Sequence, residues 1–316
     1  MLHFVLETTI FERASLAKIF AILLFFAPIA DAKNFQFMAI GDTSYVSASQ
    51  LDQLVDRINH EPTRFTIHVG DIKSGSTLCS DDMFARVYSQ FMAFDKPLIY
   101  TPGDNEWTDC HRKNNGPYDP IERLQKIRGM FFSSDQSLGR QPLTLELQSA
   151  HAAFRNFPEN RRWAVENISF ATIHMVGSNN NDQPELPSSS EFKLRNEANI
   201  AWMKEVFATA RKQSHKAIVF AMQADTFYDP SKPPESGFID WLTAFQQEMS
   251  SWKKPVLLIQ GDSHVFKVDR PLAAKGPGLD LVQRLVVPGA QLTDAVVIEV
   301  DPESATQIFT VRRLLN

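Results

Sequence analysis

Four short apolar runs in this chain are each followed by the same pair of residues, a glycine and then an aspartate. The runs are FQFMAI, FTIHV, PLIYT (with Pro102 after it) and PVLLIQ, and their length and content are typical of buried strands. The pairs are Gly41-Asp42, Gly70-Asp71, Gly103-Asp104 and Gly261-Asp262. In an open α/β sheet, ligands lie beyond the carboxyl ends of the strands. The repeat therefore predicts carboxylates that converge on one crevice.

The segments between the first three strands have helical spacing. Residues Ser49–Asn59 place Leu51, Leu54, Val55 and Ile58 on one face, and Asp82–Phe94 has a similar apolar stripe. Strand–loop–helix units that follow one another imply parallel strands with helical crossovers. The fold class that we predict is α/β.

The rest of the chain contains further strands and two long helices. We expect a hairpin with Asn167 in its turn, an irregular insertion at 133–158 and a polar loop at 178–190. The other predicted elements are helices Phe192–Gln213 and Phe238–Trp252, and strands Ala217–Met222, Arg284–Val287, Ala295–Val300 and Ile308–Leu314.

The converging aspartates carry the first functional inference. A single Gly-Asp pair is an ordinary turn, but four pairs at equivalent strand ends are hard to explain as turns. Carboxylates that meet in one crevice repel one another, and cations among them remove the repulsion. We therefore predict a metal site that includes Asp42, Asp71, Asp104 and Asp262.

The order of these motifs resembles that of the calcineurin-like metallophosphoesterase superfamily. The segments that carry the resemblance are MAIGDTS, FTIHVGDIKSG, PLIYTPGDNEW, VFAMQAD and LLIQGDSH, which span most of the chain after its first residues. The resemblance implies an αββα sandwich of mixed sheets with flanking helices. It also implies two metal ions bridged by an aspartate and a hydroxide.

The resemblance can be followed residue by residue. It places metal ligands at Asp42, Asp71, Asp104, Gln223, Asp262 and His264, with Asp71 as the bridging residue. Several positions differ from the family pattern. Ser44 and Asn105 stand where the family has histidines, Gln223 replaces a lone histidine, and Asp262 replaces the first histidine of the last motif; Glu106 keeps the acidic position of its motif.

These substitutions make the predicted site richer in oxygen. Oxygen ligands favour Mg²⁺, Mn²⁺ or Ca²⁺ over Zn²⁺, so we expect one or two divalent ions, with Fe and Zn still open. The resemblance gives catalytic roles to Asp71 and to the position of Asn105, but an amide cannot transfer a proton as a histidine does. His111 could compensate, or it is simply a surface histidine.

Other side chains have a structural interpretation as well as a functional one. Lys73 and Arg112 could hold a phosphate oxygen, or they are simply solvated. His68 and His174 lie inside predicted strands and are expected in the core, and Trp107 could pack there or stack on a ligand ring.

Two functions from different classes fit this pattern. The first is an exported metal-dependent hydrolase that cleaves a phosphorylated small molecule or a phosphodiester. The second is a catalytically impaired protein on the same fold that binds a metal or a phosphorylated ligand, which the changes at Ser44, Asn105 and Gln223 favour. The formal net charge of −5 argues against binding to a nucleic-acid scaffold. The oligomeric state is not indicated.

The first residues read as an export signal. Lys18 precedes the run IFAILLFFAPI, and Ala30-Asp31-Ala32 has the small residues of a cleavage site. We predict a signal peptide at 1–32, a single domain at 33–316, no membrane span after cleavage, and a secreted or periplasmic location. An oxidising compartment favours a disulfide between Cys79 and Cys110, the two cysteines of the chain. They could instead be unrelated free thiols.

Overall fold

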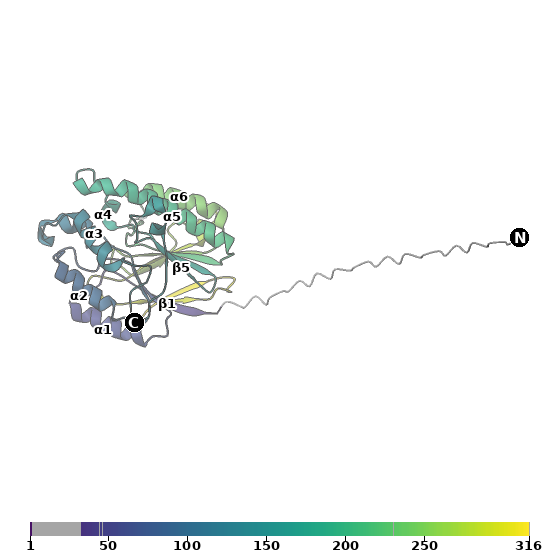
Figure 1. Ribbon diagram of the computed structural model, residues 1–316, viewed down its shortest axis with the longest axis horizontal. Helices are drawn as coiled ribbons and strands as arrows, with labels where there is room; N and C mark the ends of the chain where they lie inside the picture. The colour runs from purple at the N-terminus through teal and green to yellow at the C-terminus, as the bar shows by residue number, and fades with distance from the viewer. Residues whose placement is uncertain (2–32, 44, 46, 230, 316) are drawn as a thin grey trace. The chain divides into compact units, whose positions relative to one another are not determined.

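Two β-sheets pack face to face between two sets of helices in this computed structural model, which describes residues 1, 33–43, 45, 47–229 and 231–315 (Figure 1). The first sheet has the strand order β12-β11-β1-β2-β3 and the second has the order β4-β5-β6-β7-β8-β10-β9. The predicted signal peptide lies outside the described residues. Among the described residues, no helix is long and apolar enough to cross a membrane.

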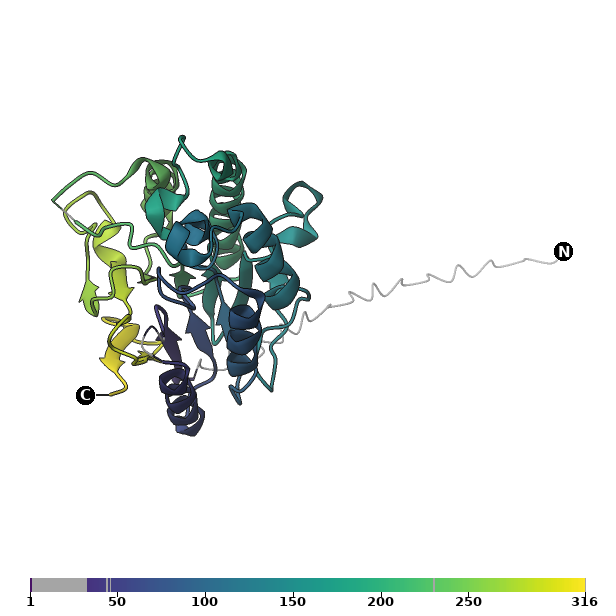
Figure 2. The same cartoon turned by 90° about the vertical axis from the view of Figure 1, so that its left-hand side faces the viewer.

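The parallel strands of each sheet have their carboxyl ends on the same side. In the first sheet β1 (Phe35–Ile40), β2 (Thr66–His68) and β3 (Leu98–Tyr100) are parallel. The C-terminal strands β11 (Val296–Val300) and β12 (Phe309–Arg313) continue this sheet in antiparallel register, and Figure 2 shows them in yellow. The loops after β1, β2 and β3 therefore leave the first sheet on the same side.

The second sheet has the same kind of parallel centre. The strands β6 (Ile168–Thr172), β7 (Ala217–Ala221), β8 (Val256–Gln260) and β10 (Val282–Val286) are parallel to one another. The antiparallel strands lie at its margins: β4 (Glu146–Leu147), β5 (Arg161–Val165) and β9 (Lys267–Asp269).

The helices cover the outer faces of the two sheets. On the first sheet lie α1 (Ala48–His60), α2 (Asp81–Phe91) and α3 (Pro120–Phe131). On the second lie α5 (Ser190–Lys212) and α6 (Ser236–Trp252). A short turn of residues with positive φ forms α4 (Gly177–Asn180). The 3₁₀ helices are η1 (Thr108–His111), η2 (Lys113–Asn115), η3 (Gln148–Ala150), η4 (Ala152–Phe154), η5 (Pro187–Ser189) and η6 (Leu279–Leu281).

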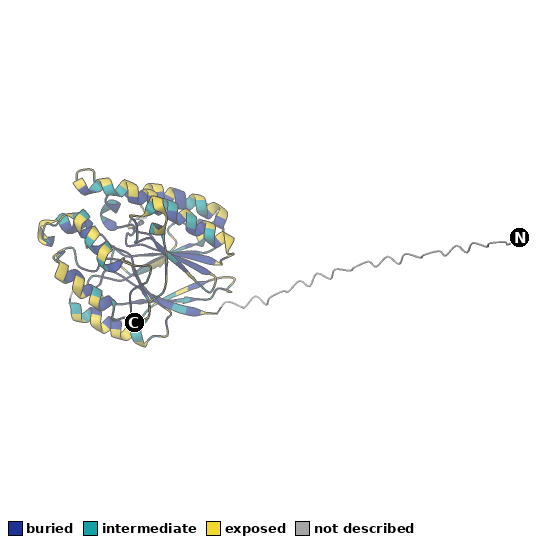
Figure 3. Ribbon diagram, viewed as in Figure 1, coloured by how far each residue is buried: buried dark blue, intermediate teal, exposed yellow. Residues whose placement is uncertain are grey.

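The core between the sheets is aromatic. The rings of Phe37 and Phe65 stack with centroids 5.1 Å apart, and Phe170 from the second sheet meets both rings edge-on. The central strands are buried on both faces, whereas each helix buries one face and exposes the other (Figure 3). This arrangement confirms the predicted α/β class and the αββα sandwich of mixed sheets.

The sequence pattern located the elements closely. The hairpin forms as predicted, with Glu166 and Asn167 at positive φ in its turn. The edge strands β4 and β9 were not predicted, because two or three residues carry no visible periodicity. The predicted disulfide is present: Cys79 and Cys110 are joined, with their Cα atoms 5.9 Å apart.

Candidate metal centre

The loops after the parallel strands hold their carboxylates in tight turns. Asp42, Asp71 and Asp262 have φ angles of +51°, +56° and +67°, and His264 has a φ of +61°. Such angles are unusual for residues with a side chain and cost about 1 kcal/mol or more each. Each turn directs a side chain away from the end of its strand into the space that the two sheets share.

Three of these side chains come together. Asp42, Asp71 and His264 offer ligand atoms that all lie within 4.8 Å of one another. Nε2 of His264 lies 3.4 Å from Oδ1 of Asp42. Asp42 and Asp71 are almost fully buried, whereas the His264 side chain is about one third exposed. The group is thus reached from solvent on the histidine side.

Asp104 and Asp262 lie on either side of the Gly177 backbone. A Cβ atom at Gly177 would be 2.7 Å from Oδ1 of Asp262 and 3.0 Å from Oδ2 of Asp104, so only glycine fits between them. Gln223 connects this loop to the carboxylates: its Oε1 accepts from the N–H of Gly177, and its Nε2 donates to Oδ1 of Asp104 at 3.0 Å. Ser178 Oγ donates to Oδ2 of Asp104 at 2.8 Å.

Asn105 and Tyr45 surround the carboxylate of Asp71. The amide Nδ2 of Asn105 donates to Oδ2 of Asp71 at 2.7 Å, and its backbone N–H donates to Oδ1 at 3.2 Å. The Tyr45 hydroxyl donates to Oδ2 of Asp71 at 2.8 Å and accepts from Nδ2 of Asn105 at 3.0 Å. Both donors favour the ionised form of this buried acid.

Glu106 lies below these groups and fixes their backbone. Its Oε1 accepts from the N–H groups of Gly103 and Asp71, at 2.7 and 3.2 Å, and from the hydroxyl of Tyr100 at 2.8 Å. Its Oε2 is buried and makes no hydrogen bond with the described residues. Glu106 therefore joins the loops after β2 and β3.

The ionisation of the cluster reflects crowding of like charges. Burial raises the pKa of Asp71 well above its usual range, and the charges of Asp104 and Asp42 raise it further. Burial and the same kind of repulsion raise the pKa of Asp262, and burial raises that of Asp42. Burial also raises the pKa of Glu106 to about 6. The pKa of His264 rises because it pairs with Asp42.

Three further candidates, His111, Lys73 and Arg112, make no direct hydrogen bond or ion pair with the acids of the cluster among the described residues. Two of them still lie beside it, because burial lowers the pKa of Lys73 while the charges of Glu106 and Asp71 raise it, and Arg112 Nη2 donates to Ser178 Oγ at 3.5 Å. His111 is in η1, where its Nδ1 lies 2.7 Å from the carbonyl oxygen of Thr108, and it makes no hydrogen bond or ion pair with the acidic cluster in the part of the chain that the structure describes. Lys73 is buried and donates to the carbonyl of Ser74. Arg112 pairs with Asp109. Ser44 lies outside the described residues.

The remaining candidates are core residues. His68 in β2 and His174 are fully buried, as predicted, although His174 lies two residues beyond the end of β6 and not inside a strand. Trp107 is fully buried too, with the Arg195 guanidinium over its ring. The stacking role for Trp107 is therefore excluded in this conformation.

Two residues at the site were missed by the sequence interpretation. Tyr45 belongs to the loop after Asp42, and nothing in the sequence indicates that its hydroxyl reaches Asp71. A pattern in the sequence did point to Ser178, because Gly177-Ser178 directly follows the apolar run ISFATIHMV, as Gly-Asp follows the four runs described above. The run of polar residues after it led us to predict an ordinary loop.

Comparison with known proteins identifies the architecture. No family model matches the sequence, and no curated protein matches it. Solved structures do match. A dimetal phosphatase from Danio rerio superposes with a TM-score of 0.54 at 12% identity, over 84% of this chain and 95% of that one. A structure of PhoD superposes with a TM-score of 0.56 at 13% identity, over 87% of this chain and 65% of that one.

The chain has the calcineurin-like metallophosphoesterase fold. The predicted resemblance is thus confirmed at the level of the fold. In a metallophosphoesterase-like fold the strand ends of both sheets share one edge, which is where the acidic cluster described above lies.

Proposed function

We propose that this protein is a divalent-metal-dependent hydrolase of phosphate esters. The observation that carries the proposal is the approach of Asp42, Asp71 and His264 within 4.8 Å, beside the further carboxylates of Asp104 and Asp262. Burial and the repulsion of neighbouring carboxylates raise the pKa values of Asp71 and Asp262. A divalent cation among these buried acids would remove their repulsion, which is the arrangement of a metal centre.

The donor set fits a hard divalent ion. Asp42, Asp71, Asp104, Asp262 and the Gln223 amide provide oxygen atoms, and His264 provides a nitrogen. Oxygen-rich sites favour Mg²⁺ or Mn²⁺ over Zn²⁺. When bound, one or two such ions supply positive charge for the phosphoryl oxygens and lower the pKa of a water molecule.

The residues around Asp71 support a role in orienting the substrate. Burial and the nearby charge of Asp71 raise the pKa of Tyr45, so its hydroxyl stays protonated and can donate. Asn105 also donates and does not exchange protons at neutral pH. Both groups donate to Asp71 in this structure, and we infer that they turn to phosphoryl oxygens once a substrate is bound, while the leaving group takes its proton from solvent.

Substituting Asp71 tests the proposal. Purified protein is screened with chromogenic phosphomonoesters and phosphodiesters in Mg²⁺, Mn²⁺ or Zn²⁺, and bound metal is measured by elemental analysis. Asp71→Ala is expected to lose both metal and turnover. Full activity of this variant on any phosphoester would overturn the proposal. Asp240→Ala is the matched control, because this exposed acid on α6 lies outside the cluster.

One observation favours the second function, a non-catalytic protein that binds a metal or a phosphorylated ligand. No proton donor for the leaving group is evident at the two positions that we considered. Asn105 stands where the family has a histidine, and the ring of His111 bonds within its own 3₁₀ helix. Metal uptake without turnover in every combination of the screen would support this function instead.

The disulfide supports our inference that the protein works in an oxidising compartment outside the cytoplasm. A fusion to a reporter that is active only after export would test this inference.

A further inference from the structure

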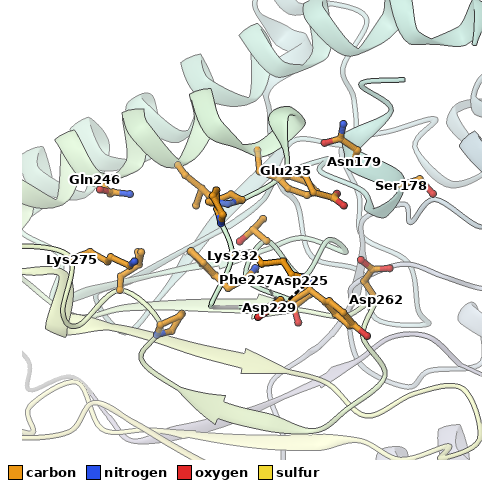
Figure 4. A pocket seen from close by; sticks show the side chains of 18 residues that line it. Ser178, Asn179, Asp225, Phe227, Asp229, Lys232, Glu235, Gln246, Asp262 and Lys275 are labelled. Carbon is orange, nitrogen blue, oxygen red and sulfur yellow. Dashed lines mark hydrogen bonds and ion pairs between the residues drawn. The ribbon is translucent and has the colours of Figure 1, made fainter. Parts of the chain in front are cut away.

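A cavity of about 550 Å³ opens next to the candidate metal centre. Its volume falls within the roughly 300–1,000 Å³ that is usual for small-molecule sites. Asp262 and Ser178 line it, and both also belong to the acidic cluster, where Ser178 bonds to Asp104. Figure 4 shows these two residues at one end of the cavity, with Gln246 and Lys275 at the opposite end. The cavity is therefore continuous with the proposed reaction site and extends away from it.

The middle of the cavity is apolar. Helix α6 contributes Phe238, Leu242 and Gln246, which are spaced four residues apart and so share one face of the helix. Phe227, from the loop after β7, and Leu272 complete the apolar wall, and both are mostly buried. Apolar walls with few polar groups are characteristic of pockets that bind organic ligands.

Two of the acidic groups on the wall, Asp225 and Asp229, are already paired, and Glu235 and Asp262 also line the cavity. Asp225 pairs with the buried Arg284 at 2.6 Å, and its Oδ2 accepts from Ser263 at 2.9 Å. Asp229 pairs with Lys232 at 3.2 Å. The middle of the cavity thus offers little net charge, and a charged group would lose hydration there without gaining a partner.

We propose that this cavity binds the organic group of the phosphoester, and that this group is uncharged, apolar and long enough to reach from Asp262 toward Gln246. This assignment rests on the proposed hydrolase function. In the reaction a water oxygen forms a bond to phosphorus, and the bond between phosphorus and the ester oxygen breaks. The departing alcohol keeps the electron pair and takes up a proton from water, and it then lies in the cavity.

Two aryl esters of different length test the proposal. Phenyl phosphate and biphenyl-4-yl phosphate have leaving groups of similar acidity, so a difference in kcat/KM reports binding of the second ring. We expect the wild-type protein to prefer the biphenyl ester by about tenfold or more, mainly through KM. Equal kcat/KM for the two esters would overturn the proposal.

Filling the cavity provides the structural control. Gln246→Trp blocks the far end from a half-buried position, and Leu242→Trp fills the middle. Both variants should bring the preference close to one by lowering kcat/KM for the biphenyl ester. Ile239→Trp is the matched control, because this exposed residue of α6 does not line the cavity, and it should keep the preference. A preference that survives in Gln246→Trp contradicts the assignment even if Leu242→Trp fails to fold.

A binding measurement separates this inference from the proposed function. Calorimetry with the product alcohol, 4-hydroxybiphenyl, should show binding to the wild type and to Asp71→Asn, and loss of binding in Gln246→Trp. Such binding without turnover of any phosphoester would support the cavity assignment and overturn the hydrolase function. Turnover without binding of the alcohol and without a size preference would support the hydrolase function and overturn the cavity assignment. If neither turnover nor binding is seen, both proposals are overturned.

Discussion

The backbone N–H of Asp262 donates to both carboxylate oxygens of Asp42, at 3.1 and 3.2 Å, although 220 positions separate the two residues in sequence. Asp42 follows β1 of the first sheet, and Asp262 follows β8 of the second. One carboxylate thus joins the edges of both sheets at the place where the acids converge. The side chain of Asp42 has a structural role as well as a proposed ligand role.

Two substitutions at Asp42 separate these roles. Asp42→Asn keeps an oxygen acceptor for the Asp262 N–H but removes the charge, so it should stay folded and lose most of its affinity for Mn²⁺. Asp42→Ala should in addition lose about 1–3 kcal/mol of stability, because the buried N–H is left without an acceptor. Calorimetric titration with Mn²⁺ and urea unfolding measure the two effects. Unchanged Mn²⁺ affinity in Asp42→Asn would remove Asp42 from the ligand set.

The Tyr45 hydroxyl is expected to act on turnover more than on metal binding. Tyr45→Phe removes a donor beside Asp71 without removing a carboxylate, so kcat should fall about 10- to 100-fold while Mn²⁺ affinity changes little. Steady-state kinetics on an aryl phosphate gives the first value and calorimetry the second. Tyr88→Phe, on α2 and outside the cluster, should behave like the wild type.

The disulfide should contribute substantially to stability. The bond joins cysteines that are 31 positions apart and ties the loop before α2 to η1, which follows Asp104. In the loop-entropy model its loss costs about 3–4 kcal/mol. The double variant Cys79→Ser with Cys110→Ser should show this loss in urea unfolding, and the wild type should show the same loss in dithiothreitol. Insensitivity of the wild type to reduction would contradict this expectation.

Acid should destabilise the protein through His68. Burial lowers the pKa of His68 in the folded state from 6.5 to about 3. The unfolded chain takes up a proton near pH 6.5, and the folded protein does not. Stability is therefore lost as the pH falls from about 6.5 toward 3, by at most about 1.4 kcal/mol per pH unit from this group.

The comparison variant for this effect is His68→Leu. Between pH 7 and pH 5 its unfolding free energy should fall less than that of the wild type, even if it starts lower. Identical pH slopes in urea unfolding for the two proteins would show that His68 does not contribute.

The sequence predicted which strand ends form the site, but not how the loops around them contact one another. The Gly-Asp pairs located Asp42, Asp71, Asp104 and Asp262 because a strand end is a local feature, and its place at the sheet edge follows from parallel topology. The contact between Tyr45 and Asp71, in contrast, depends on how one loop folds over another, which no local pattern encodes. His111 is close in sequence to Cys110 and Asp104, but its ring bonds within its own 3₁₀ helix, so its catalytic role stays a prediction.

Gly103 sits against Asp71 so tightly that an added methyl group would lie 2.1 Å from Oδ1 and 2.5 Å from the backbone nitrogen. The turns after β2 and β3 therefore touch main chain to main chain, and neither has room to shift. A protein assembled in this way can exchange imidazole for carboxylate at the tips of its strands while the frame beneath stays in place. Substitutions at the strand tips can therefore change the chemistry of the site without a change in the architecture.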